Sequence, residues 1–489
     1  MTDLSAPLAA IATAAADKLG ADAVVTERAA LRTYECDGLA AYRCIPGLVV
    51  LPRTAADVAF VVRRCHELGV PFVARGSGTG LSGGALPVET GVLIVMTRMT
   101  AIKEISVDDE RAVVEPGVIN LNITRAVADD GYLYAPDPSS QQVCSIGGNV
   151  AENSGGAHCL KYGFTAHHVT GLEVVLPDGT IERFGGLAPD SPGYDVVGSF
   201  VGSEGTLGIA TEVTVRLLRR PETVQTLLAG FRGMDDAGAA VSAIVAAGIL
   251  PSAIEMMDDL SIAAAEAAVS CGYPPGAGAV LIVELDGPLA EVEADLGAVE
   301  KLCRDAGAFE LRVAVDEAER VAIWRGRKSA FAAMGRISPD YIVQDGVVPR
   351  TSLPEVLRDI AALSEETGIR VANVFHAGDG NLHPLVLFDE SKGETDSAEA
   401  VSRRILDLCI EHGGSITGEH GVGHDKKKHM GRMFSDVDLD VMQLVRCAFD
   451  PDSLCNPGKV FPTPRLCGER PGRKTGVHPL QAAGVADIF

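Results

Sequence analysis

Apolar runs of strand length flank an amphipathic helix near the N-terminal end of the chain. Thr54 and Asp57 are spaced as a capping box, which predicts a helix that runs to about Leu68 and ends at Gly69. The strands predicted around this helix are Gly47–Leu51, Pro71–Ala74 and Val92–Met96. The pattern therefore predicts strands on both sides of a helix, with a glycine-rich connection between the last two strands.

Farther along, the apolar pattern changes to a hairpin and then to a regular alternation of strands and helices. Gly171–Leu176 and Ile181–Phe184 are joined by an Asp178-Gly179 turn, which predicts a β-hairpin. Later segments are predicted as the strands Thr223–Phe231, Gly278–Leu285, Phe309–Val313 and Arg370–His376 and the helices Asp235–Ala247 and Leu289–Ala306. This alternation favours an α+β domain with an antiparallel sheet.

The chain is too long for one ordinary hydrophobic core. Its 489 residues predict two or three domains. We expect a first domain at residues 1–220 and the α+β domain at residues 221–440. Residues 441–489 are expected to form a C-terminal segment that returns to the first domain through Phe449–Lys459.

Composition narrows the class of protein. A formal net charge of −24 argues against binding to nucleic acid or to an anionic membrane, because both require basic patches. No apolar run approaches the roughly 18 residues of a membrane-spanning helix, and no signal-peptide pattern is present. The 11 cysteines contain no C-x-x-C pair, which favours reduced thiols over disulfides or an iron–sulfur cluster. We therefore expect a cytoplasmic enzyme.

A glycine-rich loop follows the second predicted strand. It reads Arg75-Gly-Ser-Gly-Thr-Gly80 and continues to Gly84, so that it contains the pattern G-x-G-x-x-G. A Rossmann fingerprint would open a helix, but this loop leads to another strand, and no Lys-Ser/Thr pair completes a P-loop. Its bare N–H groups can form an anion-binding nest, and the alternative is a plain glycine-rich turn.

Two histidines border a turn in the second half of the chain. His376 and His383 are flanked by the apolar runs Arg370–Phe375 and Pro384–Phe388, and if these runs pair as a hairpin, both imidazoles face one ion. Glu419 follows in the sequence Gly-Glu-His-Gly. Two histidines and one carboxylate with open positions describe a catalytic site for a divalent metal. The alternative is a pair of buried core histidines.

His420 stands next to Glu419 and can take a proton there. Neighbouring residues on an extended backbone point to opposite sides, so we expect these two residues to do different jobs unless the flanking glycines bend the chain. Glu419 is expected to bind the ion and His420 to act as the base. The basic run Lys426–Lys428 is typical of a solvated helix start, so its lysines and the flanking His424 and His429 are expected at the surface.

Six motifs occur in an order that resembles one family. They are R-G-S-G-T-G (75–80), S-I-G-G-N-x-A-x-N-S-G-G (145–156), G-S-E-G-T-L-G-I (202–209), H-x-G-D-G-N-x-H (376–383), G-E-H-G-x-G (418–423) and N-P-G-K (456–459). The order resembles the FAD-linked oxidases of the vanillyl-alcohol oxidase type over about residues 30–462. Within them it is similar to the group of glycolate oxidase D subunits, D-lactate dehydrogenases and D-2-hydroxyglutarate dehydrogenases, and most similar to the first of these. The resemblance implies an α+β fold, with a two-subdomain FAD-binding domain and an α+β cap domain that contains an antiparallel sheet.

The resemblance also implies which residues bind the cofactor and the substrate. The implied FAD-binding residues are Arg75, Gly76, Ser77, Gly78, Thr79, Gly80, Pro136, Asp137, Ser145, Gly148, Asn149, Asn153, Ser154, Glu204, Gly208, Ile209 and Asn456. FAD is expected to be bound non-covalently, because the first loop lacks the histidine to which some relatives attach it. In relatives the arginine that matches Arg327 pairs with the substrate carboxylate, as a guanidinium fork does well; the alternative is a solvated surface cation.

The activity implied by the resemblance is the FAD-dependent, metal-assisted oxidation of a D-2-hydroxy acid, glycolate or D-lactate, to the 2-oxo acid. His376, His383 and Glu419 would hold zinc, or else manganese or iron, while hydride passes to flavin N5 and His420 takes the hydroxyl proton. Rival interpretations are a dehydrogenase of longer acids of the D-2-hydroxyglutarate type, a non-catalytic flavin relay subunit of a larger complex, and a zinc hydrolase.

The route of the electrons out of the chain is also an expectation. The sequence has no iron–sulfur motif of its own. We therefore expect electrons to pass to an iron–sulfur partner, with a second flavin subunit, in a glycolate oxidase complex, or else to another acceptor. Such partners could hold the cytoplasmic protein at the inner membrane.

Overall fold

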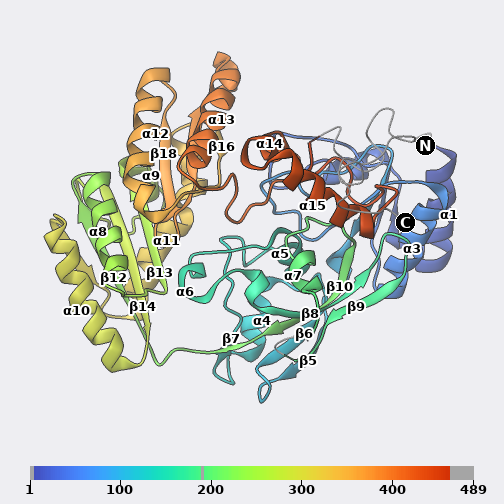
Figure 1. The fold of residues 1–489 in the computed structure, drawn as a ribbon, viewed down its shortest axis with the longest axis horizontal. Helices are drawn as coiled ribbons and strands as arrows, with labels where there is room; N and C mark the ends of the chain where they lie inside the picture. Colours follow the sequence, from blue (N-terminus) through green and yellow to red (C-terminus); the bar gives the residue numbers. More distant parts are fainter. Residues whose placement is uncertain (1–4, 189–191, 463–489) are drawn as a thin grey trace.

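The computed structural model describes residues 5–188 and 192–462, and Figure 1 shows how their elements are arranged. The N-terminal part contains a four-stranded sheet of order β1-β2-β4-β3 and a five-stranded sheet of order β5-β6-β10-β8-β9. Its strands are β1 (Val24–Val25), β2 (Leu48–Val50), β3 (Phe72–Arg75), β4 (Val92–Val95), β5 (Ile102–Ser106), β6 (Arg111–Val114), β7 (Tyr132–Leu133), β8 (Val169–Val175), β9 (Ile181–Gly185), β10 (Ile209–Arg216) and β11 (Leu218–Arg219). Its helices are α1 (Ala6–Leu19), α2 (Arg28–Leu31), α3 (Ala55–Leu68), α4 (Asn120–Val127), α5 (Ile146–Glu152), α6 (Cys159–Tyr162) and α7 (Val196–Phe200).

Local signals determine the elements that precede the glycine-rich loop. Thr54 and Asp57 form the predicted capping box of α3, and Gly69 ends the helix in the left-handed conformation at φ 62°. β2 and β3 both run parallel to β4, which lies between them. Because the carboxyl ends of β3 and β4 lie at one edge of the sheet, the loop between them begins at that edge.

The second part of the chain is built on a nine-stranded sheet (Figure 1). Its main order is β15-β12-β14-β13-β18-β19-β17, and β20 pairs with both β16 and β18. The strands are β12 (Thr223–Phe231), β13 (Ala253–Asp258), β14 (Ala279–Gly287), β15 (Glu310–Val313), β16 (Asp340–Val343), β17 (Gly346–Val347), β18 (Val371–His376), β19 (Asn381–Leu382) and β20 (Pro384–Phe388). The helices are α8 (Met234–Ala246), α9 (Asp259–Val269), α10 (Leu289–Asp305), α11 (Glu317–Ala333), α12 (Leu353–Thr367) and α13 (Thr395–Glu411).

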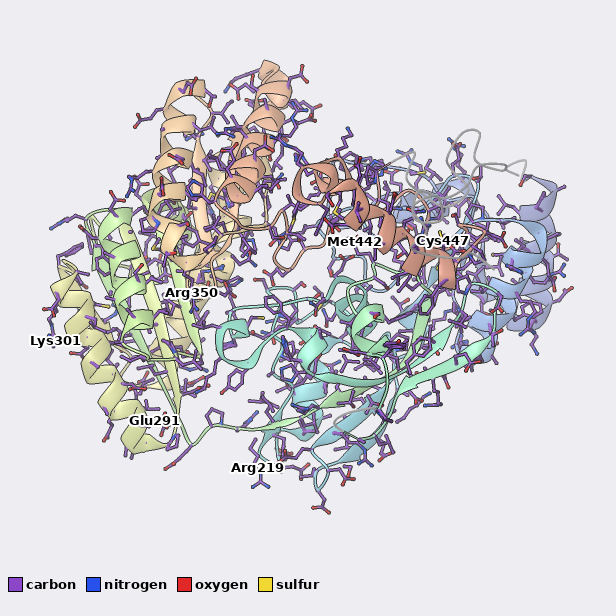
Figure 2. All side chains as sticks on the ribbon, viewed as in Figure 1. Arg219, Glu291, Lys301, Arg350, Met442 and Cys447 are labelled. Atoms are coloured by element: carbon purple, nitrogen blue, oxygen red, sulfur yellow. The ribbon has the colours of Figure 1, made fainter. Side chains whose placement is uncertain are left out.

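Helices cover both faces of this sheet, because successive side chains of its strands point to opposite sides. Leu227 of β12 packs in a core with α8 and α10, whereas Leu228 packs in a second core with α9 and α11. The outer face of α10 is charged, and Glu291 and Lys301 point away from the sheet (Figure 2). The predicted antiparallel α+β arrangement of this region is confirmed.

The C-terminal part of the described chain returns to the first sheet. After α14 (Met430–Met433) and α15 (Asp436–Phe449), the Phe72 N–H donates to the Leu454 carbonyl and the Asn456 N–H to the Phe72 carbonyl, each at 2.8 Å. No helix among the described residues is long and apolar enough to cross a membrane. Nine described cysteines are free. Cys447 lies on α15 (Figure 2).

Candidate active site

A cavity of about 1060 Å³ lies where the two parts of the chain meet. The glycine-rich loop lines it together with the predicted metal ligands His383 and Glu419 and the predicted base His420, whereas His376 and Arg327 are not among its lining residues. The predicted residues found there are Arg75, Gly76, Ser77, Gly78, Thr79, Gly80, Ser145, Gly148, Asn149, Ser154, Glu204, Gly208, Ile209, His383, Glu419 and His420. The structure therefore brings together in one cavity residues from five of the six motifs.

The glycine-rich loop fits a ligand that lies close to its backbone. A Cβ atom at Gly76 would collide with Ser145 Oγ, and one at Gly78 would collide with the Arg75 guanidinium. Gly78 also has a φ of 71°, which side chains rarely adopt. The Ser77 N–H donates to Ser145 Oγ at 3.3 Å, so the first two motifs hold each other in place. Backbone N–H groups without side chains around them can approach an anion closely, which suits the pyrophosphate of FAD.

Four of the predicted FAD residues do not line the cavity. They form hydrogen bonds with neighbouring segments instead. Asn456 Nδ2 donates to the carbonyls of Gly84 and Glu204 at 2.9 and 2.6 Å. Three others bind neighbouring segments: the Pro136 carbonyl accepts from Asn120, the Asp137 carboxylate binds His158, and Asn153 Oδ1 accepts from the Ala166 N–H. Direct contact of these four residues with FAD stays a prediction.

The two candidate metal-binding histidines lie at the mouth of the predicted hairpin. β18 and β20 pair antiparallel, and His376 pairs with Asn381 across the turn. The centroids of the His376 and His383 imidazole rings are 5.1 Å apart, and the ring planes meet at 87°. His376 Nε2 lies 3.3 Å and His383 Nε2 3.0 Å from the same oxygen, Glu419 Oε1. Three ligand atoms of the types that zinc prefers therefore converge on one point.

Each histidine has a buried carboxylate beside its other ring nitrogen. Glu255 Oε1 lies 2.6 Å from His376 Nδ1, and Asp345 Oδ1 lies 3.9 Å from His383 Nδ1. The Glu255 carboxylate is within hydrogen-bond distance and can orient His376 with Nε2 toward the ion, whereas Asp345 acts on His383 only through its charge, because His383 Nδ1 has no hydrogen-bond partner among the described residues. Sequence reasoning missed both residues, because their burial beside the histidines becomes visible only in the folded sheet.

The pKa values of His376 and Glu419 are shifted in opposite directions, each by the charge of its neighbours. Burial lowers the pKa of His376, but the carboxylates of Glu255 and Glu419 outweigh it and raise this pKa well above its ordinary value. Burial raises the pKa of Glu419, but hydrogen bonds from His376 and His383 lower it far more. Glu419 is therefore ionised, and a positive charge beside it is strongly favoured. A divalent cation at this position fits the donor set.

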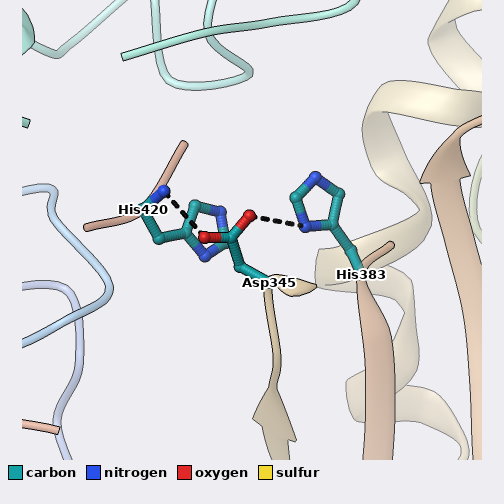
Figure 3. A group of neighbouring side chains, drawn as sticks. All are labelled: Asp345, His383 and His420. Atoms are coloured by element: carbon teal, nitrogen blue, oxygen red, sulfur yellow. Dashed lines mark hydrogen bonds and ion pairs between the residues drawn. The ribbon is translucent and has the colours of Figure 1, made fainter. Parts of the chain in front are cut away.

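Asp345 organises the loop that carries Glu419 and His420. Its carboxylate accepts hydrogen bonds from the N–H groups of Gly418, Glu419 and His420 at 2.9–3.3 Å. Figure 3 shows the bond from the His420 N–H. It also accepts from the Thr417 hydroxyl at 2.6 Å and from the Lys426 ammonium at 3.2 Å. The backbone curls around this carboxylate, so Glu419 and His420 both line the cavity although they are neighbours. The bent backbone therefore allows Glu419 and His420 to face the same cavity, which an extended backbone would not.

Asp345, His383 and His420 form a second group whose possible ligand atoms lie within 4.8 Å of one another. This group is a poor metal site, because the Asp345 oxygens are already occupied by the loop N–H groups and by a fully buried ammonium, that of Lys426. A cation there would face the Lys426 charge. Among the described residues no lysine or arginine binds Glu419, so the group of His376, His383 and Glu419 is the candidate metal site.

Replacing Asp345 with asparagine tests this organising role. The Asp345→Asn variant keeps the shape but loses the charge that balances Lys426 and turns an NH₂ group toward N–H donors. We expect metal affinity and kcat to fall roughly 10- to 100-fold, the range for partners that orient metal ligands. Metal titration of the metal-free protein measures the first effect. Asp258→Asn, a change at a buried helix-capping aspartate of the same sheet, should leave metal affinity intact.

His420 is placed and tuned as a proton acceptor. Its ring stacks on His383 with centroids 5.0 Å apart at 11°. Burial lowers the pKa of His420 to about 4, so the imidazole is neutral near pH 7. Its Nδ1 has no hydrogen-bond partner among the described residues. A neutral imidazole beside the metal ligands can accept a proton.

Arg327 lies behind the histidines and not at the surface. It is 3% exposed, and its Nε donates to Glu255 Oε2 at 2.6 Å. Glu255 therefore connects Arg327 to His376. Nη2 of Arg327 is buried without a hydrogen-bond partner among the described residues. The interpretation of Arg327 as a solvated cation is wrong, and a free donor remains for an anionic ligand.

Two expectations about the basic run near the loop are wrong. Lys426 and His429 are buried, at 2% and 9% exposure, and were expected at the surface. Lys426 is buried because Asp345 supplies its counter-charge. The loop also binds the FAD-side part of the chain, since the N–H groups of Val422 and Gly423 donate to the Glu204 carboxylate at 2.7 Å each. Glu204 thus connects the two halves of the cavity.

Known proteins are similar to this chain in sequence and in fold. The family described as FAD binding domain matches residues 46–185, and FAD linked oxidases, C-terminal domain, matches residues 220–460. The chain is 54% identical to the glycolate oxidase subunit GlcD of Escherichia coli (strain K12), over 89% of this chain and 88% of that protein. It is 33% identical to the D-lactate dehydrogenase of Anaerostipes hadrus, over 87% and 91%. Solved p-cresol methylhydroxylase has a similar fold, with a TM-score of 0.79, 18% identity and coverage of 94% and 98%.

Proposed function

The chain belongs to the FAD-linked oxidases, in the group of glycolate oxidase D subunits and D-lactate dehydrogenases, and we propose that it oxidises glycolate or D-lactate to the 2-oxo acid. It is an FAD-dependent oxidoreductase, as its sequence predicted. The observation that carries the proposal is the convergence of His376 Nε2, His383 Nε2 and Glu419 Oε1 beside the neutral His420, in the cavity that the glycine-rich loop lines.

Each residue has a part in the proposed reaction. His376, His383 and Glu419 would hold a divalent ion, for which zinc fits the ligand set best and manganese or iron are alternatives. Arg327 would bind the substrate carboxylate through its free Nη2. His420 would accept the hydroxyl proton as the Cα–H bond breaks. When bound, FAD supplies a two-electron acceptor and the ion makes a coordinated hydroxyl more acidic.

The proposal is tested by metal analysis and by a substrate panel. A yellow protein that contains a stoichiometric divalent metal and reduces a dye with glycolate or D-lactate would support it. A rival non-catalytic relay subunit would bind FAD but reduce no dye with any 2-hydroxy acid. A zinc hydrolase would be colourless, and the FAD-binding family already argues against it.

The flavin is predicted to be bound without a covalent bond. Residues 75–84 of the first loop contain no histidine, and the loop offers backbone N–H groups to the cofactor. On acid precipitation we expect all of the FAD to remain in the supernatant, where its absorbance measures it. A yellow pellet after denaturation would contradict the prediction and would direct attention to Cys144, which lines the cavity.

Electrons must leave the reduced protein, and we propose a partner subunit as their acceptor. A relative at 54% identity is named as a subunit, which supports a complex. An iron–sulfur partner, with a second flavin subunit, is one choice, and another soluble or membrane-bound acceptor is the alternative. We further propose that residues 1–220 bind FAD, that residues 221–440 carry the metal site, and that residues 441–462 complete the FAD-binding part. The rest of the predicted C-terminal segment, residues 463–489, lies outside the described residues.

A further inference from the structure

Phe331 lies between the proposed substrate-binding arginine and the metal ligands. It follows Arg327 by one turn of α11, and its ring centroid is 5.7 Å from the Arg327 Cζ atom. The same ring makes an edge contact with the imidazole of His383, with centroids 5.9 Å apart. Phe331 also lines the large cavity. Its ring therefore occupies space beside any ligand that touches both Arg327 and His383.

The proposed reaction leaves one substituent of the substrate without a polar partner. The carboxylate would bind Arg327, the hydroxyl would lie by His420, and the Cα–H bond would face the flavin. The fourth substituent of Cα must then lie against the remaining side chains of the cavity. The ring of Phe331 lines the cavity and contacts both Arg327 and His383, so a substituent on that side of Cα would meet this ring. A hydrogen or a methyl group fits beside such a ring more easily than a longer chain does.

The wall beyond Phe331 is apolar close to the metal site and acidic farther away. Val343 of β16 pairs with Leu385, two residues beyond His383, and Asp340 pairs with Phe388 at the other end of the same strand. Tyr341 and Ile342 lie between them, and all four residues of β16 line the cavity. At about 3.3 Å per residue, the acidic end lies roughly 10 Å from Val343. A second carboxylate a few bonds from Cα would meet the apolar part.

The charges along this wall are also unfavourable for a second carboxylate. Besides the proposed metal ligand Glu419, the lining residues from position 221 onward include three carboxylates, Asp340, Glu390 and Glu399, but only one lysine or arginine, Lys328. The Lys328 ammonium lies 5.8 Å from the centre of the Trp324 ring. An unpaired carboxylate against apolar side chains is costly to bury.

We propose that Phe331 limits the length of the substrate, and that the apolar wall of β16 with its acidic outer end excludes dicarboxylic 2-hydroxy acids. This inference rests on the proposed function. It makes Phe331 a specificity-determining residue and separates short monocarboxylic acids from longer ones of the 2-hydroxyglutarate type.

The test compares kcat/KM for glycolate, D-lactate, D-2-hydroxyhexanoate and D-2-hydroxyglutarate, with a dye as acceptor, in the wild type and in Phe331→Ala. The wild type should prefer the two short acids. Phe331→Ala should lower the preference for glycolate over D-2-hydroxyhexanoate by roughly 10- to 200-fold, mainly through KM, which is the range for changed apolar pocket contacts. D-2-hydroxyglutarate should gain less, because the wall stays apolar and acidic. Phe309→Ala, at a half-exposed phenylalanine far along the sheet, is the matched control.

A measurement without turnover supports the kinetics. Binding of the 2-oxo products, read from the shift in flavin absorbance, should show pyruvate but not 2-oxohexanoate in the wild type, and both in Phe331→Ala. Phe331→Met nearly keeps the side-chain volume, so its preference for short acids should stay close to that of the wild type. This variant tests the inference if Phe331→Ala folds poorly. Equal rates on short and long acids in the wild type, or an unchanged preference in a flavin-loaded Phe331→Ala, would overturn the inference alone. Reduction by none of the acids would overturn the proposed function as well.

Discussion

Glu419→Gln should yield a yellow protein that contains no metal and oxidises no substrate. Glu419 Oε1 is the single oxygen that both His376 Nε2 and His383 Nε2 approach, within 3.3 Å. Glutamine keeps the shape of the side chain, but its neutral amide is a far weaker ligand for a divalent ion. Because a bound ion contributes several kcal/mol of charge stabilisation to such a reaction, activity should fall roughly 10³-fold or more.

Metal content by elemental analysis and FAD content by absorbance measure the two parts of this prediction. His376→Ala should behave like Glu419→Gln. Glu310→Gln, which removes an exposed carboxylate from β15 of the same sheet, is the control and should match the wild type. If Glu419→Gln kept its metal, or if FAD were lost together with the metal, the assignment of these residues to a separate metal site would be refuted.

The parts of the fold that short sequence signals determine could be predicted from the sequence. The ends of α3 follow from Thr54, Asp57 and Gly69, which act within a few residues of one another. The hairpin that presents His376 and His383 follows from two apolar runs around a turn. These features depend on residues that are close along the chain, so the sequence is sufficient to predict them.

The parts of the site that distant contacts determine could not be predicted. Glu255 reaches His376 over 121 positions of sequence, and Asp345 reaches Lys426 over 81. Each looks like an ordinary charged residue until the sheet brings its partner close. The expected exposure of Lys426 was wrong for this reason, since a lysine within a basic run becomes buried only when a distant carboxylate pairs with it.

Only the family resemblance assigned a role to Arg327, because the spacing of its neighbours also allowed a solvated cation. The structure places Arg327 against Glu255. Its burial depends on this partner, which lies 72 positions away in the sequence. The predicted FAD residues divide in the same way. Those in the glycine-rich loop line the cavity, whereas Asn456 and Asp137 hold neighbouring segments, which motif matching does not distinguish from direct contact.

His420→Asn should keep both FAD and metal but lose roughly 10² to 10⁴ in kcat, the range for a positioned general base. Asp345 holds the His420 backbone through its N–H at 2.9 Å, so changing the ring leaves the loop in place. Asparagine offers hydrogen bonds but cannot accept a proton near neutrality. The substrate should still bind, because the metal ligands and Arg327 are unchanged, and KM should therefore move much less than kcat.

The metal content of His420→Asn separates a base from a ligand. His420 stacks on His383 at 5.0 Å and also belongs to the second group of possible ligands, with Asp345. If His420 bound the ion, the variant would lose metal as fully as His376→Ala does, and the base would have to be another residue. His412→Asn, at a histidine on the far side of α13 that pairs with Glu355 and Asp359, controls for the loss of any imidazole. Because burial lowers the pKa of His420 to about 4, the wild-type ring is already in its proton-accepting form at pH 7, so titration of His420 should not raise the wild-type kcat further above pH 7.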